Sequence, residues 1–110
     1  MVESSDANRK TNFAPVDSEK VLAQVAELPI QSWSYRHDDP AVRHVGPTAQ
    51  DFRAAFGLGA DEQHIAPLDV NGVSLAAIQE LYRQVQMQNA RIEMLERQNA
   101  LLQAELERLQ

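Results

Sequence analysis

The chain has 110 residues, with 16 acidic against 10 basic side chains and a formal net charge of −6. This acidic balance argues against a nucleic-acid partner, because phosphate binding needs clustered lysine and arginine. No apolar run approaches the roughly twenty residues that span a bilayer, so no membrane partner is expected. A domain of this size buries a modest share of its surface, so association with other chains is an expected source of stability.

Cysteine is absent, which excludes disulfides and thiol chemistry. The three histidines, His37, His44 and His64, lack the paired spacing of metal ligands. We therefore expect no metal or other cofactor, and we predict that each histidine is a surface or hydrogen-bonded structural residue.

The first third of the chain predicts a leader, a helix and a strand. Residues 1–16 are polar and contain Pro15, which indicates an extended or irregular segment. Asp17 is a candidate N-cap for a short amphipathic helix that Pro29 ends. A strand is expected near residues 30–36, although the pattern does not decide which of its faces is buried.

A turn and a second helix are predicted next. Asp38-Asp39-Pro40 has turn composition, and a brief second strand is expected before Gly46. Thr48, with Asp51 three residues later, resembles a capping box at the start of a helix. Gly57 is placed to end that helix as its C′ glycine.

The remaining sequence predicts one more strand and a long helix. Residues 65–70 are expected to form the strand, which Pro67 would confine to a sheet edge and the Asn71-Gly72 turn would close. Ser74 is a candidate N-cap for a helix that runs without glycine or proline to Gln110. The predicted fold class is α+β: a small mixed head of short helices and strands, followed by a long C-terminal helix.

This long helix carries a heptad repeat. About thirty-six residues at about 1.5 Å each exceed the span of so small a head, which favours self-association over packing on its own head. Arg91 at position g and Glu96 at the following e would meet across a parallel interface. The heptad repeat alone does not decide between a two-stranded and a three-stranded coiled coil. The a/d seam alternates spacings of three and four and consists of Ile78, Leu81, Val85, Gln88, Ile92, Leu95, Asn99, Leu102, Leu106 and Leu109.

The leader holds one constellation with catalytic potential, Ser5-Asp6 followed by Lys10. A serine hydroxyl becomes a good nucleophile when a base takes its proton, and a lysine can serve as that base if burial lowers its pKa. Serine and lysine five apart also arise by chance. From these residues alone, a solvated polar leader is the simpler interpretation.

An ordered set of motifs changes this interpretation. The motifs lie in residues 5–17, 28–35, 43–52, 54–59 and 64–79. In this order they resemble the peptidase S74 family, the intramolecular chaperone domain at the ends of phage tail spikes and tail fibres, including endosialidases. The resemblance covers nearly the whole chain.

The resemblance implies roles for the leader residues. Ser5 matches the nucleophile at a self-cleavage point, Lys10 matches its base, and Asp6 matches the acidic residue that follows the serine. Ala7 departs from the basic residue often found at that position, which puts the local geometry in question.

The resemblance also implies a homotrimer, and hence three strands for the coiled coil. Such a domain templates the folding of an upstream fibre segment of the same polypeptide and is then released by cleavage. For His44, Gln50 and Asp51, it leaves open whether these residues do more than hold the head together.

The expected organisation is a leader with the cleavage site at 1–16, a chaperone head at 17–73 and a trimerisation helix at 74–110. The expected activity is that of a serine endopeptidase that cleaves itself once, and the alternative is a structural trimeriser that stays attached. A third possibility, release of a DNA-binding or membrane-tethered factor, would need parts outside this chain.

The expected location is a phage virion precursor in the host cytoplasm or a bacterial surface protein, with the released domain absent from the mature fibre. The sequence leaves the identity of the fibre and its receptor open. It does not decide between a viral and a bacterial origin, between the two sides of Ser5 as the point of cleavage, or between cleavage within a chain and between chains.

Overall fold

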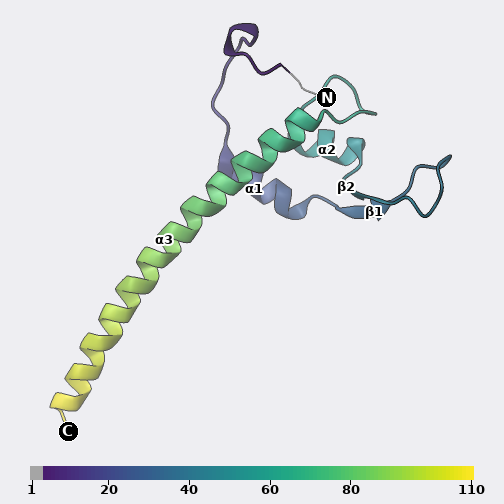
Figure 1. The fold of residues 1–110 in the computed structure, drawn as a ribbon. Helices are drawn as coiled ribbons and strands as arrows, with labels where there is room; N and C mark the ends of the chain where they lie inside the picture. The colour runs from purple at the N-terminus through teal and green to yellow at the C-terminus, as the bar shows by residue number, and fades with distance from the viewer. Residues whose placement is uncertain (1–3) are drawn as a thin grey trace.

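The structure is a computed structural model that describes residues 4–110. A small head of short helices and strands sits at one end, and the long helix α3 extends away from it (Figure 1). The principal extents are 75 × 42 × 25 Å. The predicted α+β class is confirmed, while residues 1–3 of the predicted leader lie outside the described residues. Within residues 4–110, no helix combines the length and the apolar character needed to cross a membrane.

Helix α1 spans Ser18–Glu27, as its capping signal predicts. The Asp17 carboxylate accepts a hydrogen bond from the Lys20 amide at 3.2 Å, which satisfies one of the free donors of the first turn. After Glu27 the backbone becomes extended at Leu28, ahead of Pro29. Both predicted ends of this helix are therefore confirmed.

Two short strands form an antiparallel pair. β1 spans Gln31–Trp33 and β2 spans His44–Gly46, with Ser32 opposite Val45. The Trp33 indole nitrogen donates to the Gly46 carbonyl at 3.2 Å and ties the pair together. The first two predicted strands exist, although the first of them is shorter than expected.

Helix α2 spans Ala49–Phe56 and has the predicted caps. Thr48 Oγ1 accepts from the Asp51 amide at 3.1 Å. Gly57 ends the helix in the left-handed region at φ 63°, where a residue without Cβ is favoured. The head's apolar centre lies on this helix, where Phe52 is 4% exposed and its ring centroid is 5.0 Å from that of Phe56.

Helix α3 spans Pro67–Arg108, so it begins seven residues before the predicted N-cap. The predicted strand over 65–70 and the turn at Asn71-Gly72 are wrong, because both segments are helical from Pro67 onward. Proline at the first helical position loses no hydrogen bond and has a helical φ. Ser74 is inside the helix, and its hydroxyl donates to the Val70 carbonyl at 2.8 Å.

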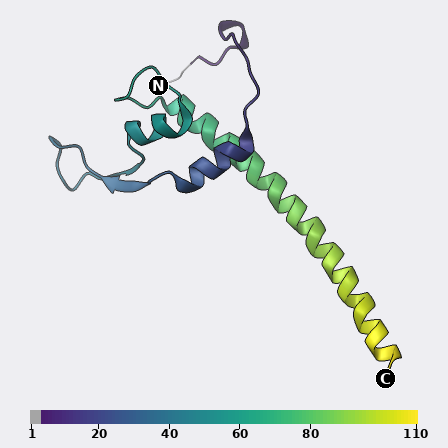
Figure 2. The same cartoon turned by 180° about the vertical axis from the view of Figure 1, so that it is seen from behind.

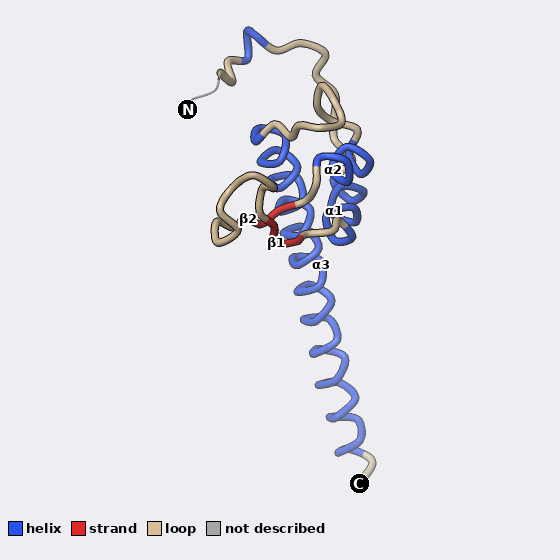
Figure 3. Tube along the Cα trace, turned by 90° about the vertical axis from the view of Figure 1, so that its right-hand side faces the viewer, coloured by secondary structure: helices blue, strands red, loops and turns tan. Residues whose placement is uncertain are grey.

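The head packs on the first part of α3 through α1. Figures 1 and 3 show α1 beside this part of the helix, while the C-terminal half extends beyond the head. Ala77 and Glu80 are each 6% exposed beneath the head. The head therefore covers a short length of α3, and no other segment of residues 4–110 covers the rest of the helix.

Candidate functional site

The leader folds into one tight turn that brings Ser5 and Lys10 together. The turn is the short 3-10 helix η1, Ala7–Arg9, with Asp6 at its N-terminus. Because a 3-10 turn is compact, it lets the Lys10 side chain return to Ser5. Lys10 Nζ lies 2.6 Å from Ser5 Oγ and donates to it. The two residues implied as nucleophile and base are thus in direct contact.

Asp6 caps the short helix η1. Its Oδ1 accepts from the Asn8 amide at 2.9 Å, and its carbonyl accepts from the Arg9 amide at 3.0 Å. These are the contacts of a capping residue that holds η1 in shape. Asp6 therefore supports the turn on which the Ser5–Lys10 contact depends.

Nothing in the described part of the chain buries the Ser5–Lys10 pair. Both residues are exposed, and Figures 1 and 2 show the leader as an arm that leaves α1 and stands apart from the head. A lysine acts as a base after its ammonium loses a proton, and burial favours that neutral form. The geometry thus brings the Ser5 hydroxyl and the Lys10 amine into contact without burying them.

The face of α3 that the head leaves free is the predicted seam. Its apolar members range from 44% exposed at Val85 to 78% at Leu109, and Gln88 and Asn99 are exposed as well. In contrast, every α3 residue that is buried or half-buried lies at heptad position c, f or g. These covered residues are Asp69, Val70, Val73, Ala76, Ala77, Glu80 and Gln84.

A hydrogen-bonded cluster around Glu80 holds α1 on α3. The Ser18 hydroxyl donates to Glu80 Oε1 at 3.0 Å, and Arg83 Nη2 donates to the same oxygen at 2.9 Å. Gln84 donates to the other carboxylate oxygen at 3.2 Å, and Arg83 also reaches Ser18. Hydrogen bonds from Arg83 first, and then from Gln84, hold the pKa of Glu80 below its usual value. Heptad analysis did not single out Glu80, and only its partner on α1 reveals its role.

The strand pair carries an aromatic cluster. The ring centroid of Trp33 lies 5.0 Å from that of Tyr35 and 5.1 Å from that of His44. His44 therefore contributes its ring to this cluster, and His64 Nδ1 lies 2.9 Å from Asp61 Oδ1 on the surface. His37 is exposed as well. Among the described residues, no group of three or more potential ligands is arranged to hold a metal ion.

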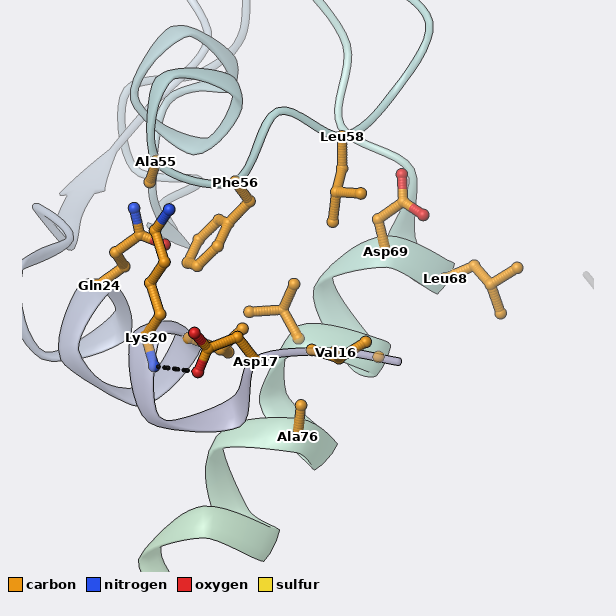
Figure 4. Close-up of a pocket in the computed structure, with 13 residues that line it drawn as sticks. Val16, Asp17, Lys20, Gln24, Ala55, Phe56, Leu58, Leu68, Asp69 and Ala76 are labelled. Atoms are coloured by element: carbon orange, nitrogen blue, oxygen red, sulfur yellow. Dashed lines mark hydrogen bonds between the residues drawn. The ribbon is translucent and has the colours of Figure 1, made fainter. Parts of the chain in front are cut away.

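A mainly apolar pocket opens between α1, the end of α2 and the first turns of α3 (Figure 4). Its volume is about 460 Å³, and Lys20 lies among its lining residues. The apolar lining includes Val16, Phe56, Leu58 and Ala76. This lining pairs no nucleophile with a base, so the pocket adds packing surface to the head without adding catalytic groups.

Comparison with known families agrees with the motif-based resemblance. The family model of peptidase S74, described as chaperone of endosialidase, matches residues 5–58. This match contains the Ser5–Lys10 contact, α1, both strands and α2. No curated protein matches the chain.

Proposed function

Because residues 5–58 belong to the peptidase S74 family, chaperone of endosialidase, we propose that this chain is an intramolecular chaperone that trimerises and then releases itself. It forms a homotrimer through α3 and templates the folding of an upstream fibre segment of the same polypeptide. The chain is then freed by serine-dependent cleavage beside Ser5.

The position of the head on α3 is the observation that carries this proposal. The head lies over positions c, f and g and leaves the a/d seam open along the whole helix. Exposed leucine, isoleucine and valine at this spacing are stabilised when they bury one another in a coiled coil. Three chains joined in this way raise the local concentration of their upstream segments and set a common register. Non-local β structure folds slowly, so a pre-formed trimer shortens its search.

The Ser5–Lys10 contact supports the release step. We propose that the assembled trimer and the folded fibre cover the pair, which favours neutral lysine. Lys10 then takes the Ser5 proton, and Oγ attacks the carbonyl carbon of the adjacent peptide bond. The C–N bond breaks as the amine receives the proton, and water hydrolyses the resulting ester to a carboxylate and restores the hydroxyl. After cleavage, unfolded fibre chains could no longer use the chaperone domain as a template for refolding, so the finished fibre would be kinetically hard to unfold.

Intact mass and denaturing gels of the full-length parent protein test the release step. The wild type should yield a C-terminal fragment that starts at or beside Ser5, while Ser5→Ala and Lys10→Ala should stay whole. Ser4→Ala and Arg9→Ala are matched controls, because they change an adjacent serine and an adjacent basic residue outside the contact. Both controls should still be cleaved. If the wild type remains full length while forming trimers, the chain is a structural trimeriser that stays attached.

A further inference from the structure

We propose that a second row of α3 residues, at heptad position e, docks each protomer onto its neighbour beneath the heads. The row consists of Leu68, Leu75 and Tyr82, which we call the e row. Its partner is a second copy of this chain, and the inference rests on the proposed parallel trimer.

The e row is large, apolar and uncovered. Leu75 is 63% exposed, Tyr82 is 62% exposed, and Leu68 is 45% exposed. Single exposed apolar residues are normal on a protein surface, but these three recur every seven residues, and Leu75 and Tyr82 flank Ile78, the first residue of the a/d seam. Around Ile78 and Leu81, Leu75 and Tyr82 widen the apolar face of the helix to the a, d and e positions, which is typical of helices inside a bundle.

Coiled-coil geometry identifies what the e row would meet. In a parallel interface, a g residue pairs with the e residue five positions later on the next chain. This places Leu75 against the neighbour's Val70 and Tyr82 against the neighbour's Ala77. Ala77 is already beneath its own head at 6% exposure, so Tyr82 would meet the edge of the neighbouring head that covers Ala77.

The same rule gives polar pairs along the rest of the stalk. Going down the helix, the g residues Gln84, Arg91 and Gln98 face Asn89, Glu96 and Gln103 at e. Apolar flanking pairs are thus confined to the part of α3 that lies beneath the head. An antiparallel arrangement would oppose the e row to this polar end. The e row therefore favours parallel chains in the same register. It would also hold each protomer against the head of its neighbour.

A cysteine cross-link tests this contact, because the chain contains no cysteine of its own. The variant Val70→Cys/Leu75→Cys places one thiol at g and one at e. Residues five apart on one helix lie on different faces and too far apart to bridge within a chain. Mild oxidation should therefore link neighbouring chains and give a covalent trimer on a non-reducing gel.

The control Val70→Cys/Gln79→Cys keeps the same g thiol and moves the other to an outward b position. It should stay largely unlinked. Sedimentation and circular dichroism of both reduced variants establish their mass and helicity. Trimeric mass without a cross-link in the first variant, or equal cross-linking in both, would overturn the e-row contact while leaving the trimer intact. Monomeric mass of the helical wild-type chain would overturn the trimer and this inference together.

Discussion

Truncation of one seam residue tests self-association with a closely matched control. Ile92 lies at position a and is 51% exposed in the single chain, whereas Met94, two residues later at position c, is 52% exposed. Both side chains thus have the same exposure before assembly and differ in heptad position. We expect Ile92→Ala to weaken the trimer and Met94→Ala to leave it unchanged.

The expected loss of trimer stability in Ile92→Ala can be worked out from the exposure of Ile92 in the single chain. Full burial of an isoleucine is worth roughly 1.5–3 kcal/mol, so burying its remaining half contributes about 1 kcal/mol per chain. The cavity left by alanine raises the loss toward about 2 kcal/mol. Three chains together lose roughly 3–6 kcal/mol, which weakens the trimer roughly 10²- to 10⁴-fold. Because trimer dissociation depends on the square of concentration, its midpoint should rise roughly 10- to 100-fold.

Sedimentation equilibrium over a range of protein concentrations measures this midpoint. Alanine is the best helix former, so neither substitution should weaken α3 as an isolated helix. Equal shifts for the two variants, or no shift for Ile92→Ala, would show that the a/d seam does not hold the chains together.

Three further predictions concern the head, the first part of α3 and the leader. Gly57→Ala should destabilise the protein by about 1–2 kcal/mol in thermal unfolding, because Gly57 has φ 63°. Gly72→Ala should stabilise the protein by roughly 0.5–1 kcal/mol, because Gly72 lies inside α3 with open space around its Cβ position. Stability changes of the same sign in both variants would contradict this assignment. Because the pKa of Glu80 is lowered in the folded protein, its contribution to folding stability is present above the usual glutamate pKa of 4.5 and is lost as the pH falls through the folded-state pKa. Glu80→Gln should therefore flatten the acid side of a stability-versus-pH curve. An unchanged curve would show that Glu80 is not the responsible group. Asp6→Asn keeps the oxygen that caps η1 and should preserve self-cleavage of the parent protein, whereas loss of cleavage would show that the carboxylate charge itself is required.

Local signals predicted most of the head. The caps at Asp17, Thr48 and Gly57 depend on side chains and backbone within a few residues, and all three are present. The a/d seam was equally readable, because helix periodicity alone sets which residues share a face. The family resemblance, carried by motifs in fixed order, was confirmed over residues 5–58.

Contacts between segments that are distant in the sequence decided where α3 begins and which of its residues are buried. The sequence from 65 to 72 has the composition of a strand and turn, yet α3 begins within it at Pro67, and Val70 and Val73 lie on the face that the head covers. Local propensity is a weak prior that tertiary packing overrides. The same packing buries Glu80 through Ser18, which is sixty-two positions away.

The sequence by itself determined which residues of the long helix share an apolar face and which leader residues place a hydroxyl and a basic side chain close along the chain. Only the tertiary structure decided that the head occupies the opposite side of α3, leaving the seam and the e row uncovered. It also placed Lys10 on Ser5 and Asp6 on the turn between them. The physical reason is that periodicity and residue type are local properties, whereas cover and contact depend on how separate segments fold onto one another.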